Sequence, residues 1–239
     1  MEIANKKDLP VISTTKRNDF VEIKFTGYVN GNVFDSNVEE DLKKIDPNGK
    51  PRETIIIVGE GMLVPGFDKT IEGKELGKEY EVNVSAKEGF GDRKRELVKT
   101  IPLKTFTEKK INPYPGMVLA MDDNLARVIT ISGARVLTDF NNPLAGKDIS
   151  YKFKIVRKVT DEKEKAKALL EFMFKFVPEF EVGENVVIKG PKFIEAYITA
   201  FNPKFKELMG KELKLEEVKN EKKSEEKKEA EIEKSEKKK

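Results

Sequence analysis

The chain has 239 residues, which is more than one small domain usually needs, so two or three domains are expected. It carries 46 Lys and Arg against 43 Asp and Glu, and this near balance gives no overall case for nucleic-acid binding. Cys and His are both absent, which excludes disulfides, thiolate nucleophiles, imidazole general bases and the usual zinc sites.

The first 17 residues lack the apolar stretch that is typical of a secretory signal. No apolar run in the chain approaches the roughly 20 residues of a membrane-spanning helix. The absence of Cys also fits a reducing compartment. We therefore expect a cytoplasmic protein that makes no membrane contact.

Short segments with the alternation of a strand dominate the first part of the chain. Residues 21–25 alternate apolar and polar, and the pattern resumes at 33–35 after a turn at 30–32. Residues 39–52 are charged and rich in turn formers, so a loop is predicted there. The β-branched run at 54–58 predicts another strand.

A short helix is predicted around Pro65. Leu63, Phe67 and Ile71 lie at the spacing of one helix face, and proline suits the first turn of a helix. Residues 78–85 then alternate again, which predicts a further strand.

The segment from 94 to 140 has an apolar rhythm of its own. Three strands are predicted, at 117–121, 126–131 and 135–140. Together they predict a small β-domain inside the sequence. Strict alternation at 149–155 then favours a central antiparallel strand.

The C-terminal part mixes helical and strand patterns. Thr160 is the predicted N-cap of an amphipathic helix, and 182–188 predicts a strand. Residues 193–201 fit either a strand or a helix, and a short helix is predicted from 202 to 209. Apolar residues at 166–174 are more typical of a core or a dimer contact than of a ligand site.

The last segment, 216–239, is dominated by Glu and Lys, in a chain that is 37% charged. Such a segment cannot bury enough apolar area to offset the cost of ordering, so disorder is expected, with a transient helix as the alternative. A weak electrostatic contact with nucleic acid or ribosomes is the alternative role for this tail.

Six short motifs resemble, in order and spacing, those of the FKBP-type peptidyl-prolyl isomerases. The motifs are Phe25-Thr26-Gly27-Tyr28, Val33-Phe34-Asp35-Ser36, Val64-Pro65-Gly66-Phe67, Glu72-Gly73-Lys74, Glu88-Gly89-Phe90-Gly91 and Asn142-Pro143-Leu144-Ala145-Gly146-Lys147. The block between Gly91 and Asn142 resembles the insert-in-flap domain of the SlyD-like branch. The added C-terminal domain with a charged tail is similar to the long archaeal type.

The resemblance implies an α+β fold in which an antiparallel β half-barrel wraps around one short helix. It also implies an inserted small β-rich chaperone domain and a C-terminal α+β domain. The expected division is an isomerase domain formed by 1–93 and 140–159, an insert at 94–139, a C-terminal domain at 160–215 and the tail at 216–239.

The resemblance further implies an apolar pocket between the helix and the sheet. Its candidate catalytic residues are Phe34, Asp35, Phe67, Phe90 and Tyr151. Its candidate substrate-binding residues are Phe25, Leu63 and Val64. Family members often have tyrosine where this chain has Phe25 and Phe90, with hydroxyls that support the pocket aspartate or bond ligand carbonyls. A macrolide ligand is therefore expected to bind with reduced affinity.

Isomerisation of an X–Pro bond breaks no covalent bond, so it needs no nucleophile, metal or cofactor, and none is expected here. The metal-binding tail of the SlyD-like branch is rich in His and Cys, which this chain lacks. The expected partners are unfolded or nascent polypeptides that contain proline.

The insert is expected to bind such polypeptides through exposed apolar residues. The candidates are Leu97, Ile101, Leu103, Phe106, Ile111 and Met117. The alternative for these side chains is the core of a small β-domain. Two other functions remain open: a holdase chaperone with weak isomerase activity, and an assembly protein that forms a homodimer through its C-terminal domain.

Overall fold

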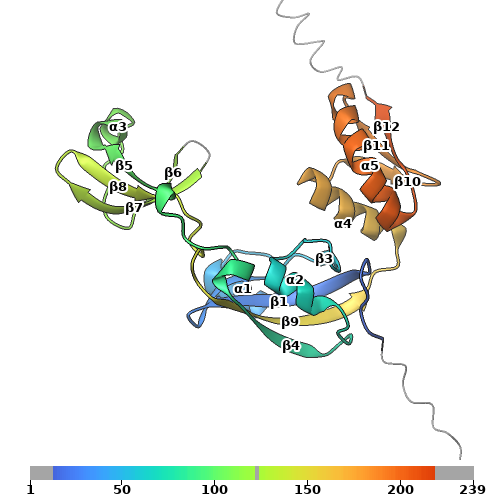
Figure 1. The fold of residues 1–239 in the computed structure, drawn as a ribbon. Helices are drawn as coiled ribbons and strands as arrows, with labels where there is room; N and C mark the ends of the chain where they lie inside the picture. The colour runs from blue at the N-terminus through green and yellow to red at the C-terminus, as the bar shows by residue number, and fades with distance from the viewer. Residues whose placement is uncertain (1–12, 122–123, 219–239) are drawn as a thin grey trace, which may run out of the picture. The chain divides into compact units, whose positions relative to one another are not determined.

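The computed structural model describes residues 13–121 and 124–218, drawn as a coloured ribbon in Figure 1. The described residues form two compact units. The first unit contains 13–16, 23–54, 59–121 and 124–156, and the second contains 17–22, 55–58 and 157–218. The finer division expected from the sequence, into isomerase domain, insert, C-terminal domain and tail, stays a prediction.

A five-stranded sheet organises the segments that carry the motifs. Its strands are β1 (Phe20–Val29), β2 (Asn32–Ser36), β3 (Thr54–Ile57), β4 (Glu79–Val84) and β9 (Ile149–Lys158). The strand order is β2-β1-β9-β4, with β3 also paired to β1. The β1–β2 and β4–β9 ladders are antiparallel. The strands predicted near 21–25, 33–35, 54–58, 78–85 and 149–155 are confirmed.

Helix α2 (Pro65–Ile71) lies where the sequence predicts it. Val64, the N-cap, is extended and Pro65 opens the first turn, as its fixed φ favours. Phe67 and Ile71, four residues apart, are both buried. A Cβ on Gly66 would lie 2.7 Å from a methyl carbon of Val84, so only glycine lets α2 approach β4 this closely.

The loop predicted for 39–52 is partly wrong, because residues 39–45 form helix α1 (Glu39–Ile45). None of its residues is buried, so no apolar face announces it in the sequence. The helix is stabilised by its charges instead. Three acidic residues lie in its first turn and two lysines in its last, so the charges at both ends complement the helix dipole. Lys43 also pairs with Glu39 at 2.6 Å, one turn away.

Residues 98–121 and 124–139 contain a separate four-stranded antiparallel sheet. Its strands are β5 (Val98–Pro102), β6 (Val118–Met121), β7 (Asn124–Ser132) and β8 (Arg135–Asp139), in the order β5-β8-β7-β6. The three predicted strands are confirmed as β6, β7 and β8. Strand β5 and helix α3 (Leu103–Glu108) were not predicted, because their apolar residues follow neither period over enough length.

The C-terminal helices differ from the sequence-based prediction in detail. Helix α4 (Glu162–Phe174) is capped by Asp161, whose side chain accepts from the Glu164 backbone N–H at 2.8 Å; Thr160, the predicted cap, lies one residue too early. Helix α5 (Glu195–Met209) runs through Pro203, so the separate helix predicted from residue 202 is wrong. Ile198 and Phe205 are both buried, which offsets the cost of roughly 3 kcal/mol for an internal proline.

A three-stranded sheet accompanies these helices. It contains β10 (Glu179–Val182), β11 (Val186–Gly190) and β12 (Leu213–Glu217), with β10–β11 antiparallel and β11–β12 parallel. The strand predicted at 182–188 is confirmed only in part: residues 186–188 belong to β11, but Val182 ends β10 and Gly183 lies between the two strands. Strand β12 extends two residues into the predicted tail. The rest of the predicted disordered tail, residues 219–239, lies outside the described residues. Residues 1–12, where no secretory signal was predicted, also lie outside them.

Within the described part of the chain, no helix combines the length and the apolar character that a membrane span requires.

Candidate functional site

A cluster of aromatic rings lies between α2 and the sheet. Phe67 of α2 stacks on Tyr151 of β9, with ring centroids 4.4 Å apart and planes 17° apart. Phe25 of β1 meets both rings edge-on, at 6.3 Å from Phe67 and 6.2 Å from Tyr151. Offset and edge-on pairs of this kind contribute about 0.5–1.5 kcal/mol each beyond the burial of their area. The rings therefore hold one another in fixed orientations.

Phe34 joins this cluster to the glycine-rich loop. Its centroid is 5.7 Å from Tyr151 and 6.0 Å from Phe90, edge-on in both cases. The structure thus brings together all five aromatic residues that the resemblance implies. Leu63 and Val64 are half-buried and immediately precede α2.

Gly27 permits the close approach of two of these rings to strand β1. A Cβ at this position would lie 2.7 Å from Cζ of Phe34 and 2.9 Å from Cε1 of Tyr151. Side-chain atoms essentially never approach this closely, so any other residue would displace one of the rings. In the β1–β2 ladder Gly27 pairs with Asp35, which places the aspartate beside the same edge of Tyr151.

Asp35 and Tyr151 are the ionisable groups of the site. Asp35 as a residue is exposed, yet desolvation of its carboxyl raises its pKa above the usual value, and the Ser36 backbone N–H opposes this shift in part. Burial, followed by the charge of Asp35, raises the pKa of Tyr151 to about 12. The phenol therefore keeps its proton throughout the neutral range.

Asn37 supports the aromatic cluster and was missed by sequence reasoning. Its side-chain oxygen accepts from the Phe25 backbone N–H at 2.7 Å, and its side-chain nitrogen donates to the Ile23 carbonyl at 2.8 Å. The residue is buried, so these bonds fix the backbone that carries Phe25. An asparagine one residue after a strand is common in ordinary turns, so no local signal distinguished it.

Phe153 is a second residue that sequence reasoning did not assign to the site. Its ring lies 5.0 Å from Phe67 and 5.4 Å from Tyr80. Strict alternation in β9 puts it on the same face as Tyr151, and this signal could have found it.

A polar network lies beside the cluster, between β1 and α1. The Thr26 hydroxyl donates to Asp41 at 2.8 Å and lies 2.9 Å from the Ser36 hydroxyl. Hydrogen bonds from Lys44 and then from Thr26 hold the pKa of Asp41 below its usual value. This network ties α1 to β1 and, through Ser36, to β2, the strand that carries Phe34 and Asp35.

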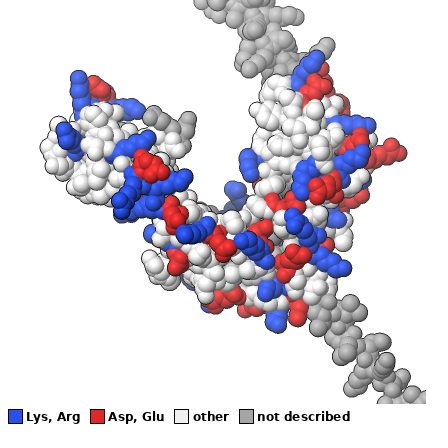
Figure 2. All heavy atoms as spheres, viewed as in Figure 1, with Lys and Arg blue, Asp and Glu red and all other residues white. Residues whose placement is uncertain are grey.

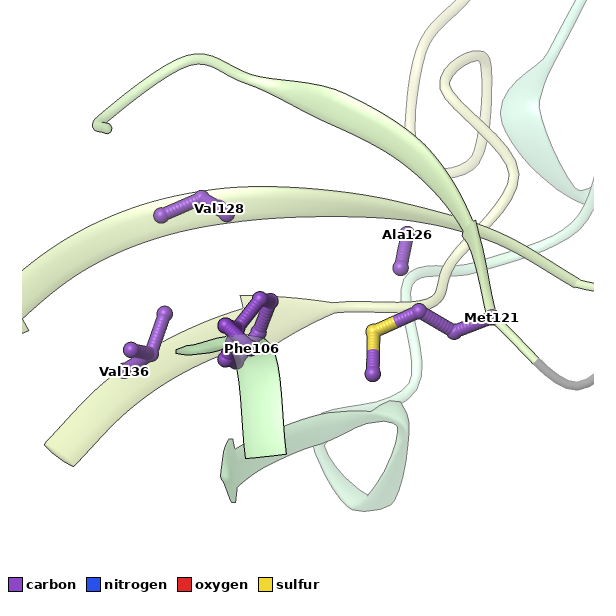
Figure 3. Close-up of a cluster of buried hydrophobic side chains, with 5 residues drawn as sticks. All are labelled: Phe106, Met121, Ala126, Val128 and Val136. Carbon is purple, nitrogen blue, oxygen red and sulfur yellow. The ribbon is translucent and has the colours of Figure 1, made fainter. Parts of the chain in front are cut away.

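The candidate client-binding residues of the insert are largely core. Phe106 is 1% exposed, so its expected place on the surface is wrong: it anchors α3 on the sheet. Figure 3 shows it with the other buried side chains of the cluster. Four further candidates pack against this cluster and are half-buried: Ile101, Leu103, Ile111 and Met117. Leu97 is also half-buried.

Other apolar residues of the insert are exposed instead. They are Tyr114 at 62%, Val118 at 58%, Leu125 at 63% and Ile129 at 38%. In β7, Leu125 and Ile129 alternate with the buried Ala126 and Val128, so one face of the strand is buried and the other is exposed. Among residues 13–121 and 124–218, no three carboxylates gather so that they could hold a metal ion.

Comparison with known proteins identifies the family of this chain. Residues 13–107 match the family model "FKBP-type peptidyl-prolyl cis-trans isomerase", and residues 99–144 match the model "FKBP26, IF domain". The short-type peptidyl-prolyl cis-trans isomerase of Methanocaldococcus jannaschii is 32% identical over 148 residues, which cover 61% of this chain and 94% of that protein.

Two further relatives are the SlyD isomerase of Helicobacter pylori and the trigger factor of Desulforamulus reducens. The first is 23% identical over 63% of this chain and 78% of its own length. The second is 35% identical over 48% of this chain but only 23% of its own length. This chain belongs to the FKBP-type peptidyl-prolyl cis-trans isomerases, and it is an isomerase with an IF-domain segment and an added C-terminal region.

Proposed function

We propose that the chain catalyses rotation about X–Pro bonds of unfolded or nascent polypeptides in the pocket formed by the five aromatic residues and Asp35. The observation that carries this proposal is the Phe67–Tyr151 stack, flanked edge-on by Phe25 and Phe34 and bordered by a desolvated carboxyl. In this proposal the five-stranded sheet and α2 make up the half-barrel of the family, with residues 94–139 as its inserted domain.

The proposed mechanism follows from the electronic structure of the prolyl amide. Resonance makes the C–N bond partly double, so rotation is slow, with a barrier of about 18–20 kcal/mol. The planar amide is more polar than the twisted one, so removing water from its carbonyl weakens resonance and favours the twisted state. The rings around Phe67 would exclude that water and hold the proline ring while the carbonyl turns.

Asp35 would act through its field and not as a base. A carboxylate at the rim of an apolar pocket interacts more strongly with a rotating dipole than it would in water. Its raised pKa is the sign of the desolvation on which this effect depends. Macrolide binding with reduced affinity, cytoplasmic localisation, and a contact of the tail with nucleic acid or ribosomes all stay predictions.

Replacing Asp35 with Ala or Asn is expected to lower kcat/KM for a proline tetrapeptide about tenfold, because the field at the rotating carbonyl is lost. The fold should persist, since the residue is exposed. In the wild type, activity should fall as the pH drops through an Asp35 pKa that lies above 3.8; in Asp35→Asn this step should vanish. Exchange NMR on the peptide measures both quantities.

Ionisation of Asp35 lowers the free energy of unfolding, whereas ionisation of a salt-bridged aspartate raises it. Because the folded-state pKa is raised, the ionised carboxyl opposes folding at neutral pH, and protonation relieves this cost. The melting temperature of Asp35→Asn should therefore equal or exceed that of the wild type. Turnover equal to wild type in both Asp35 variants contradicts the proposed role.

Chaperone activity is proposed for the insert, through its exposed residues Tyr114, Val118, Leu125 and Ile129. Contiguous exposed apolar surface is typical of protein-binding sites. Figure 2 shows that the visible face of the insert has a broad area without charged residues, with lysines and arginines at its margin. The alternative, a holdase with weak isomerase activity, differs only in the rate on a short peptide, so the peptide assay separates the two.

We also propose that the C-terminal region forms a homodimer. An apolar groove of about 690 Å³ lies between the end of α4, the start of β10 and the start of α5. Phe176, Phe193 and Tyr197 line it and are 55%, 73% and 57% exposed. A second copy of the same surface would cover these rings, as an interface enriched in aromatic residues does.

The double substitution Phe193→Ser and Tyr197→Ser is expected to convert a dimer to a monomer, because it removes two central aromatic residues at small cost to the fold. Light scattering coupled to gel filtration measures the mass. Ile45→Ser, at a 42% exposed position of α1, is the matched control and should leave the mass unchanged. A monomeric wild type, or a double variant with the mass of a dimer, excludes this interface.

A further inference from the structure

Tyr151 carries the one hydroxyl among the five aromatic residues of the proposed pocket, since the other four are phenylalanines. Its residue is 5% exposed, and its ring is held by the stack on Phe67 and by the edges of Phe25 and Phe34. The orientation of the hydroxyl is therefore set by the pocket and not by free rotation of the side chain.

The position of this hydroxyl follows from Gly27. The Cε1 atom of Tyr151, which is bonded to the carbon that carries the hydroxyl, lies against the Gly27 backbone. Gly27 pairs with Asp35 across the β1–β2 ladder. The phenol therefore lies on the side of the pocket where Asp35 is found, and the effect of the Asp35 charge on the Tyr151 pKa agrees with this placement.

The hydroxyl is available to a ligand. Within the described part of the chain it makes no hydrogen bond, and it is not among the fully buried polar atoms that lack a partner, so it retains some accessible surface. By contrast, the hydroxyl of Tyr80, at the far end of the same ring cluster, accepts from the Glu75 backbone N–H at 2.9 Å.

The chemistry of the substrate calls for a donor. A proline residue has no backbone N–H, so an X–Pro segment offers the pocket two carbonyl acceptors and an apolar ring. An ionised Asp35 can only accept and cannot bond either carbonyl. A phenol that stays protonated can donate to one of them.

We propose that the Tyr151 hydroxyl donates a hydrogen bond to a carbonyl oxygen of the bound X–Pro segment and so determines how the peptide is seated in the pocket. This inference rests on the proposed function of the pocket. Phe25 and Phe90 have no hydroxyl and cannot donate a hydrogen bond to the substrate, so Tyr151 of β9 would supply the donor in their place. Asp35, on the same side, acts on the same segment through its charge.

The test is Tyr151→Phe, which keeps the ring and its stack and removes one oxygen. We expect kcat/KM for a proline tetrapeptide to fall about three- to tenfold, as the loss of one neutral hydrogen bond implies, with the melting temperature unchanged. Tyr80→Phe is the matched control. It removes a hydroxyl that bonds the backbone, so it should lower the melting temperature and leave kcat/KM unchanged.

Peptides with sulfur in place of oxygen in either carbonyl show whether the bond is to the substrate. Sulfur is a weak acceptor, so the wild type should discriminate against one of the two thioxo peptides, relative to their uncatalysed rates, while Tyr151→Phe should discriminate less. Equal discrimination by both enzymes for both peptides overturns the proposal.

The outcomes also separate this inference from the proposed function. Impaired turnover in Asp35→Ala with wild-type turnover in Tyr151→Phe overturns the role of the hydroxyl alone. Wild-type turnover in both variants contradicts the pocket itself.

Discussion

Replacing residues 95–138 with a short Gly-Ser loop is expected to abolish acceleration of proline-limited refolding while leaving kcat/KM for a tetrapeptide nearly unchanged. The excised segment has its own core around Phe106 and contributes none of the pocket rings. Its removal should not open the fold, because the chain ends on either side are already joined: Asn141 donates to the Lys94 carbonyl at 2.9 Å and accepts from the Lys94 N–H at 2.8 Å.

Refolding of a reduced, unfolded protein with a slow prolyl phase measures the first quantity, and the peptide assay measures the second. A less disruptive variant, Val118→Ser with Leu125→Ser, keeps the insert and replaces two of its exposed apolar side chains with polar ones. It should lower the refolding rate and not the peptide rate. Equal loss on protein and peptide substrates shows that the insert has no binding site of its own.

Phe67→Ala is expected to impair both stability and catalysis. Phe67 is 1% exposed and contacts the rings of Phe25, Tyr151 and Phe153, so its removal leaves a cavity in the core. Truncation of a buried phenylalanine costs about 3–5 kcal/mol in the free energy of unfolding. The pocket also loses its floor, so turnover should fall more than in the Asp35 variants.

Denaturant unfolding at 25 °C measures the stability, and the peptide assay under native conditions measures the turnover. Phe67→Leu is the matched variant, since it retains most of the volume and removes only the aromatic face. It should be more stable than Phe67→Ala and still be impaired in turnover. If Phe67→Leu turns over peptide as fast as the wild type, an aromatic floor is not needed.

The rings of the proposed pocket were easier to predict from the sequence than the residues that hold those rings in place. Four of its five rings lie within short motifs whose order and spacing carry the resemblance, so motif position could name them. The fifth, Tyr151, lies in the alternating segment that follows the last motif. Phe153 could have been found, because the alternation in β9 puts it on the same face as Tyr151. Asn37 escaped because it acts through contacts across the fold, with the backbone of Phe25 and Ile23. Such contacts depend on strand register, which one sequence does not reveal.

Other predictions of secondary structure were wrong where tertiary packing or charge outweighs the local sequence preference. Pro203 indicated a helix start, yet burial of Ile198 and Phe205 carries α5 through it. Helix α1 has no buried residue, so hydrophobic periodicity could not detect it. Phe106 was predicted to lie on the surface but is buried. A short apolar segment does not show by its pattern alone which of its residues face the core.

The central claim is that the ring pocket between α2 and the sheet is where proline is bound and turned. Backbone amide chemical-shift mapping with a proline tetrapeptide tests it most directly, with an alanine-for-proline peptide as the control. The account predicts that the largest shifts occur at Gly27, Asp35 and Phe67 and require the proline. Shifts confined to residues 98–139 or to the C-terminal groove would contradict it.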